Sequence, residues 1–430
     1  MTQLRARGAE LVGKTNLDEF GMGSHSTNSA TPGPVSLGAS GRSAGGSSGG
    51  SAVAVLLGEA DVALGTDTGG SVRLPAAYTG VVGFKPSYGM ISRHGVVPYA
   101  NSLDTVGFLA REVRAISRLV VEGGLCAEHD PLDPTSLSGE ARKRCAADRE
   151  GYQASGEKNR RVTSTRPLAG LKFGLPLEYN IEELEPCIRD AWSATATKLQ
   201  ELGARIIPVN LPSTRHALSA YYVIAPAEAS SNLAKYDGVR YGSRDATGSD
   251  AAGSVLYSAT RGRGFGPEVR RRILLGSYTL SSEAMDNYFV RAQRVRRLVG
   301  RDFDRVFALP NPLREAETFD LSDIAEDVAL ESKLGPAEVD FLLCPTAPTL
   351  PPKLEDVAKQ TPVDAYMNDV FTVPASLAGL PAISIPVPVT LGAEADEDCP
   401  NYAGLQLIGQ YWDDARLLAV AEAVSDSAVG

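Results

Sequence analysis

The chain has 430 residues, 43% of them hydrophobic and 22% charged, and its formal net charge at pH 7 is −10. This composition is that of an ordinary globular protein with a sizeable core, and the acidic balance excludes the chain as a whole from binding a phosphate backbone. It has no apolar run of about 18 residues that could span a membrane. Five scattered cysteines without a CxxC pair indicate free thiols in a reducing compartment and no zinc site.

The N-terminal quarter of the chain alternates short β-like runs with loops rich in Gly and Ser. The runs are ELVGKT (10–15), DVALGT (61–66), TGVVGF (79–84) and TVGFLA (105–110). This alternation predicts a core sheet that carries functional loops. The opening LRARGAELVGKTN is interpreted as the end of a helix that leads into a strand, an improbable natural start for a domain.

The rest of the chain predicts an α/β protein with two or more surface insertions. A strand at 171–177, a helix around 188–202 and a strand at 204–212 form a βαβ succession. Helix is also predicted at 111–123, over most of 215–300 and at 413–425, and strand at 339–344, 382–389 and 405–408. Charged or Ser-rich stretches at 128–165, 315–331 and 393–399 are expected to be surface insertions or loops.

Two Gly/Ser-rich loops lie between Gly41 and Arg73, separated by the apolar run AVAVLL and a β-like run. The second loop, TDTGGS, places two glycines directly before Ser71. Glycines allow a close backbone approach, and consecutive N–H groups in such a turn can point at one oxyanion. Ser71 is therefore a candidate nucleophile. Asp67 and Arg73 flank it, either as an ion pair or as two solvated charges.

Three other interpretations of these loops fit less well. A flexible linker does not alternate with tightly spaced apolar runs. A phosphate-binding loop needs the pattern GxxxxGK[ST], which is absent. A Ser–His–Asp hydrolase needs a histidine base, and none of the 4 histidines stands in a comparable setting. A serine activated by a lysine fits better.

The two loops resemble the amidase signature family, whose catalytic centre is a Ser–Ser–Lys triad. The resemblance implies that Ser71, after the GTDTGG turn, is the nucleophile. Ser47, the first serine of GGSSGG, would lie in a cis peptide and bridge the nucleophile to the lysine. The N–H groups of Thr68, Gly69 and Gly70, with that of Ser71, would form the oxyanion hole. The family fold is α/β, with a large mixed β-sheet covered by helices on both faces.

Further segments are similar to one branch of this family, the A subunits of glutamyl-tRNA(Gln) amidotransferases. They are GKTNLDEFGMGSHSTNS (13–29), GFKPSYGMISRHGVVPYANSLDTVG (83–107), SSNLAKYDGVRYG (230–242), GFGPEVRRRILLGSYTLSS (264–282) and YMNDVFTVPASLAGLPAISIP (366–386). The family lysine lies in a GxPxxxKDN-type segment that would fall before Met1. This chain contains no KDN, and Lys14 and Lys85 match other family segments. We therefore expect one amidase domain over residues 1–430 that lacks its N-terminal part.

The same branch implies how free glutamine is held. A glutaminase needs an arginine for the α-carboxylate and an aspartate for the α-ammonium group. The segments AQRVRRL, YMNDVFT and VRYG match the glutamine-binding segments of the family at Arg296, Asp369 and Tyr241. Without the family, an arginine in so basic a helix would as readily be solvated.

The resemblance implies a glutaminase that supplies ammonia to a B subunit. That B subunit would use ATP and Mg²⁺ to convert Glu-tRNA(Gln) to Gln-tRNA(Gln), with a small third subunit present; no cofactor is expected in this chain. A free-standing amidase for small amides and an inactive structural subunit stay open as alternatives. The insertions resemble organellar subunits, which favours the mitochondrial matrix, with a bacterial cytoplasm as the alternative.

Overall fold

The computed structural model describes residues 2–30, 33–157, 166–245, 257–315, 339–392 and 398–428. The predicted insertion at 315–331 lies outside the described residues except for Glu315, as do 158–165 of the first insertion and most of the loop at 393–399.

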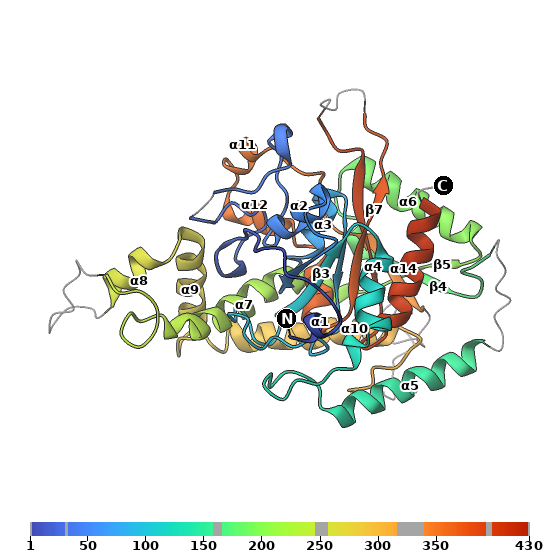
Figure 1. The fold of residues 1–430 in the computed structure, drawn as a ribbon, viewed down its shortest axis with the longest axis horizontal. Helices are drawn as coiled ribbons and strands as arrows, with labels where there is room; N and C mark the ends of the chain where they lie inside the picture. Colours follow the sequence, from blue (N-terminus) through green and yellow to red (C-terminus); the bar gives the residue numbers. More distant parts are fainter. Residues whose placement is uncertain are drawn as a thin grey trace, which may run out of the picture.

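A single mixed sheet of eight strands forms the centre of the molecule, in the order β1-β3-β2-β7-β8-β6-β4-β5 (Figure 1). Neighbours pair antiparallel from β1 to β6, whereas β6, β4 and β5 run parallel. The strands are β1 (Val62–Asp67), β2 (Val82–Lys85), β3 (Thr105–Ala110), β4 (Lys172–Pro176), β5 (Arg205–Val209), β6 (Phe341–Pro345), β7 (Ala382–Pro388) and β8 (Tyr402–Ile408). The predicted α/β fold with a mixed sheet is confirmed.

The middle of the sheet is built from the C-terminal end of the chain. Strands β7 and β8 pair with Ser384 opposite Gln406 and Ile385 opposite Leu405, and all four side chains are buried. A strand that is covered on both faces has a nearly continuous apolar sequence, which is why AISIPVP could be predicted as a strand.

Helices cover the sheet on both faces (Figure 1). Helix α6 links the parallel strands β4 and β5, as the βαβ pattern predicted. The helices are α1 (Thr2–Ala6), α2 (Gly49–Leu57), α3 (Arg73–Thr79), α4 (Val113–Ser117), α5 (Gly139–Glu157), α6 (Pro186–Glu201), α7 (Ala217–Asn232), α8 (Ser258–Gly264), α9 (Pro267–Thr279), α10 (Phe289–Val306), α11 (Leu354–Val357), α12 (Pro362–Met367), α13 (Val373–Ala378) and α14 (Asp414–Ala428).

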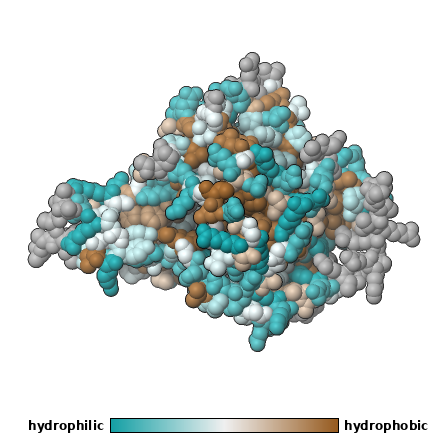
Figure 2. Space-filling view, in the orientation of Figure 1, coloured by the Kyte–Doolittle hydropathy of each residue, from teal (hydrophilic) through white to brown (hydrophobic). Residues whose placement is uncertain are grey.

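One local prediction from the N-terminal region is wrong. The run at 10–15 is not a strand: it pairs with no described strand, and Leu11 and Val12 are 55% and 74% exposed. A short β-like run does not form a strand without a partner edge. The run AVAVLL belongs to helix α2 and buries Ala52 and Val55. Figure 2 shows hydrophobic residues gathered near the middle of one face of the molecule.

Helix α5 lies at the edge of the molecule, within the predicted insertion at 128–165 (Figure 1). Arg142 anchors it, because this buried guanidinium donates hydrogen bonds to the carbonyls of Leu137, Cys126, Gly89 and Met90. Among the helices of the described ranges, none is both long and apolar enough to cross a lipid bilayer.

Candidate active site

The two Gly/Ser loops meet next to the C-terminal end of strand β1, where helices α2 and α3 begin. The Ser48 N–H donates to the Ser71 carbonyl at 3.1 Å, and the Thr66 N–H donates to the Ser48 hydroxyl at 3.3 Å. The Gly46–Ser47 peptide bond is cis, as the resemblance implied. The structure thus brings the Ser47 and Ser71 segments together, with Ser47 buried and Ser71 partly exposed.

The Ser47 hydroxyl is buried and has no hydrogen-bond partner within the described part of the chain. Buried polar atoms are rarely left unpaired, so this oxygen is available for a function. His25 is also buried, but its ring nitrogens are engaged by the Ser43 hydroxyl and by Asn368. Burial lowers the pKa of His25 to about 4. His25 is therefore not placed as a base for either serine.

The turn from Thr68 to Ser71 presents its backbone N–H groups without internal partners. None of these four groups donates a hydrogen bond to another residue that the structure describes. The turn is held from outside, because the Thr68 hydroxyl donates to Asp104 at 2.7 Å and the Thr372 hydroxyl donates to the Gly69 carbonyl at 2.6 Å. Unpaired, immobilised N–H groups beside a serine are what an oxyanion hole requires.

Gly70 cannot be replaced without moving this turn. Its φ is +151°, which L side chains rarely adopt, and a Cβ atom there would lie 2.3 Å from the Thr372 Oγ1. The glycine next to it is equally restricted, because a Cβ at Gly69 would lie 2.6 Å from the Tyr221 ring. The GG pair of the motif is therefore explained by close contacts on both sides.

Asp67 and Arg73 form a bidentate ion pair, with N–O distances of 3.0 and 2.8 Å, and both side chains are fully buried. The sequence had left open whether these two residues pair or are each solvated, and the structure shows that they pair. Burial alone would raise the pKa of Asp67, but the charge and hydrogen bonds of Arg73 outweigh it, and the pKa is lowered. The Asp67 carboxylate also accepts from the Val72 N–H at 3.2 Å, which fixes the residue after Ser71.

Arg73 ties the turn to the C-terminal part of the chain. Its remaining hydrogen bonds go to the Thr372 carbonyl at 2.9 Å, the Ser376 hydroxyl at 2.9 Å and the Gln406 amide oxygen at 3.2 Å. The loop that carries Ser71 is therefore held by helix α13 and strand β8.

Asp369 lies close to this turn, since the hydroxyl of Thr372 bonds both the Asp369 carbonyl and the Gly69 carbonyl. Its carboxylate accepts from the Tyr222 hydroxyl at 2.8 Å and the Ser24 hydroxyl at 3.2 Å. Burial raises the pKa of Asp369 to about 6, although these hydrogen bonds and a nearby arginine lower it. The predicted aspartate thus lies beside the turn that carries Ser71.

That arginine is Arg272 on helix α9, which sequence reasoning missed. Its guanidinium is buried, donates to Glu268 at 2.8 Å and to the Tyr99 hydroxyl at 2.7 Å, and lies 5.3 Å from the centre of the Tyr222 ring. It lies in the segment 264–282 that the resemblance had singled out, and it is one of the buried positions of α9, which are Glu268, Val269, Arg272, Gly276 and Thr279.

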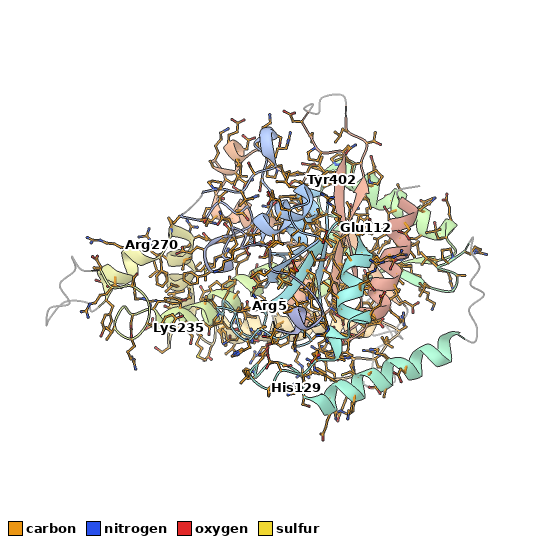
Figure 3. The ribbon with its side chains drawn as sticks, in the orientation of Figure 1. Arg5, Glu112, His129, Lys235, Arg270 and Tyr402 are labelled. Atoms are coloured by element: carbon orange, nitrogen blue, oxygen red, sulfur yellow. The ribbon has the colours of Figure 1, made fainter. Side chains whose placement is uncertain are left out.

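The structure does not bring Arg296 and Tyr241 to the Asp369 carboxylate. Arg296 donates to the Leu377 carbonyl at 3.0 Å, the Ser102 hydroxyl at 2.7 Å and the Ser102 carbonyl at 2.8 Å. Tyr241 is 50% exposed and packs on Tyr236. Lys235 lies over the Tyr241 ring and is labelled in Figure 3 at one end of the molecule.

A cavity of about 910 Å³ opens beside the turn and includes Gly21, Thr66, Thr68 and Asp104 in its wall. The Cβ position of Gly21 is 3.6 Å from the Ser47 hydroxyl, so the cavity reaches the vicinity of this serine. Burial raises the pKa of Asp104 to about 6, although hydrogen bonds from Thr68 and two backbone N–H groups lower it.

An α/β sheet protein with two serine segments beside unengaged backbone N–H groups has the arrangement expected of an amide hydrolase that uses serine. A family model described as Amidase matches residues 1–418, and the chain belongs to the amidase family. It is 71% identical over 430 residues to the A subunit of the mitochondrial glutamyl-tRNA(Gln) amidotransferase of Podospora anserina, covering 99% of this chain and 82% of that protein.

A second relative and a solved structure agree with this assignment. The mitochondrial A subunit of Neurospora crassa is 66% identical over 455 residues, covering 99% of this chain and 82% of that protein. The crystal structure of the glutamyl-tRNA(Gln) amidotransferase A subunit from Thermotoga maritima superposes with a TM-score of 0.68 at 32% identity, covering 98% of this chain and 75% of that chain.

Proposed function

We propose that this chain is the glutamine-hydrolysing A subunit of a mitochondrial glutamyl-tRNA(Gln) amidotransferase. The observation that carries the proposal is the meeting of the Ser47 and Ser71 segments beside the unengaged N–H groups of residues 68–71, in a chain 71% identical to a protein of that name. Localisation in mitochondria follows the names of the relatives.

Free glutamine is held at its α-carbon by two opposite charges. We assign its ammonium group to Asp369, a buried carboxylate that accepts hydrogen bonds from the Tyr222 and Ser24 hydroxyls. We assign its carboxylate to Arg272, whose charge acts on Asp369 across the Tyr222 ring. The family match assigned this carboxylate to Arg296 instead. Both guanidinium groups are engaged in the structure, Arg296 by Ser102 and Leu377 and Arg272 by Glu268 and Tyr99.

The side-chain amide then reacts at Ser71. The Ser71 Oγ attacks the amide carbon while its proton passes to Ser47, whose own proton goes to the lysine base that the family carries in its KDN-type segment. The carbonyl oxygen becomes an oxyanion that the N–H groups of Thr68, Gly69 and Gly70 stabilise. The C–N bond breaks, ammonia leaves with a returned proton, and water hydrolyses the Ser71 ester to glutamate.

The other steps belong to partners. The ammonia would pass to a B subunit, which converts Glu-tRNA(Gln) to Gln-tRNA(Gln) with ATP and Mg²⁺, and a small third subunit would complete the complex. Amide hydrolysis by this chain would need no cofactor, because serines and backbone N–H groups would supply the chemistry together with the family lysine.

The test compares glutamate release from glutamine by three proteins, each assembled with the B and third subunits. They are the 430-residue chain, the same chain extended at its N-terminus with the KDN-type segment of the family, and the extended chain with Ser71→Ala. We expect rapid hydrolysis only by the second. Equal hydrolysis by the Ser71→Ala protein would refute the assignment, and preferential hydrolysis of simple aliphatic amides would favour a free-standing amidase.

A further inference from the structure

Helices α9 and α10 carry a continuous track of exposed apolar and arginine side chains. Leu274 and Tyr278 are one turn apart on α9 and are 70% and 58% exposed. The ring centres of Tyr278 and Tyr288 are 5.8 Å apart, and Tyr288, the residue directly before α10, is 45% exposed. The track therefore crosses from one helix to the next without a break.

The track continues along α10 as an arginine face. Arg291 and Arg294 are exposed, and with Leu298, 44% exposed, they follow at helical spacing on one side of the helix. Arg297, also exposed, lies at the edge of this side. We call Leu274, Tyr278, Tyr288, Arg291, Arg294 and Leu298 the α9–α10 track.

The arginines of the track have no carboxylate partner on their own helix. No ion pair to Arg291, Arg294 or Arg297 occurs among the described residues, and the first acidic residue of α10 is Asp302, which is buried and accepts from the Ser213 N–H. Like charges at this spacing oppose each other, and this happens on a chain whose net charge is −10. Such a concentration of positive charge calls for an acidic complement from outside the helix.

The residue types of the α9–α10 track fit a protein partner better than RNA. Arginine, tyrosine and exposed aliphatic side chains are typical of the cores of protein interfaces. RNA contacts favour basic groups with aromatic stacking, whereas this track also exposes two leucines, and the acidic chain as a whole repels polyphosphate. Figure 1 shows α8 and α9 projecting from the sheet at one end of the molecule, and Arg270 of α9 is labelled at that end in Figure 3.

We propose that the α9–α10 track docks an acidic, partly apolar surface of another subunit of the amidotransferase. This inference rests on the proposed function, because the occupant is a partner in that complex. The leucines and tyrosines would supply the desolvated centre of the contact, and the arginines would pair with carboxylates of the partner.

The test measures binding of the purified full chain to co-expressed B and third subunits by analytical ultracentrifugation. Two variants remove the two halves of the track: Leu274→Ser with Tyr278→Ser, and Arg291→Glu with Arg294→Glu. The control is Lys143→Glu with Arg144→Glu, two exposed positions on α5, which Figure 1 places toward the other end of the molecule from α9. Circular dichroism verifies that each variant is folded.

We expect each track variant to weaken binding at least about tenfold and the α5 control to bind like the wild type. In the wild-type complex, hydrogen exchange of residues 274–298 should slow relative to the free chain, a readout that needs no variant. Equal binding by all proteins with unchanged exchange would overturn the docking site and leave the proposed function intact. If the wild-type chain binds neither subunit, the proposed function fails and this inference with it. A loss of tRNA binding or of self-association without loss of subunit binding would assign the track to RNA or to a second copy and overturn the proposal.

Discussion

The buried ion pair beneath the Ser71 turn makes a strong prediction for Arg73→Met. Methionine fills a similar volume but removes both hydrogen bonds to Asp67 and those to Thr372, Ser376 and Gln406. The Asp67 carboxylate stays fully buried and retains only weaker donors, such as the Val72 N–H at 3.2 Å.

The expected loss of stability is about 3–5 kcal/mol, the usual cost of removing one partner of a buried pair. Folded domains are stable by about 5–15 kcal/mol, so this loss is a large fraction of the total. It also depends on pH. In the wild type, Arg73 keeps the pKa of Asp67 low despite burial. The ionised carboxylate therefore contributes stability at neutral pH, and this contribution is lost only when the pH falls through the lowered pKa of Asp67. In the variant, only Lys85 and the Val72 N–H still oppose the effect of burial. We expect the pKa of Asp67 to rise above its unfolded value, so that stability is regained as pH falls through it.

The assay is urea unfolding followed by the fluorescence of the two tryptophans, at pH 8 and pH 5. The gap between wild type and Arg73→Met should be widest at pH 8 and should narrow at pH 5. Adding Asp67→Asn to the variant should recover part of the loss at pH 8, because no charge is then buried alone. A loss below about 1 kcal/mol at pH 8, or the same gap at both pH values, would refute the reasoning.

Three further predictions concern glutamine hydrolysis by the assembled enzyme. Arg272→Gln should raise the KM for glutamine about 10–100-fold, because a hydrogen bond to a charged group contributes about 1.5–3 kcal/mol. Arg296→Gln should change the KM less than about threefold. Gly70→Ala should lower kcat about 100-fold with a smaller effect on KM, because the new Cβ lies 2.3 Å from the Thr372 hydroxyl and displaces the oxyanion hole. The KM should rise about tenfold per pH unit below pH 6, because the pKa of Asp369 is about 6 and only its carboxylate binds the ammonium group.

Each of these has a control. A raised KM for Arg296→Gln with a normal KM for Arg272→Gln would return the carboxylate to Arg296, as the family match suggested. Gly13→Ala, where a Cβ meets nothing within 4 Å, should leave kcat unchanged, and so should not mimic Gly70→Ala. Asp369→Asn should abolish the rise in KM at low pH; if the rise persists, another group causes it.

Local patterns in the sequence predicted a run at each of the eight described strands, but not the order of the strands in the sheet. The βαβ unit at 171–212 and the apolar run of β7 were visible because their periodicity depends only on neighbouring residues. The placement of β7 between β2 and β8 depends on pairings between segments far apart in the chain, which no local pattern encodes. Helix α3 was not predicted. All its residues from Arg73 to Thr79 are buried, so its sequence lacks the alternation of polar and apolar faces by which a helix is recognised.

Ser71 could be predicted from its glycine-rich turn and Ser47 from the family resemblance, whereas most of the groups that surround them could not. Asp369 was found through a family segment, but the choice between Arg272 and Arg296 depends on which helix faces the site. Both helices are rich in arginine, and only the folded chain shows the partners of each: Glu268 and several tyrosines for Arg272, and Ser102 and Leu377 for Arg296. Thr372 is a similar case, since its contact with Gly69 joins positions 303 residues apart.

The strands at the centre of the sheet are synthesised after the other six, since β7 and β8 span 382–388 and 402–408. During synthesis, the edges of β2 and β6 therefore stay open, and open edges attract other strands. Arg73 has no Gln406 to bind until β8 has been made, so we expect the nascent chain to need chaperone protection up to that point.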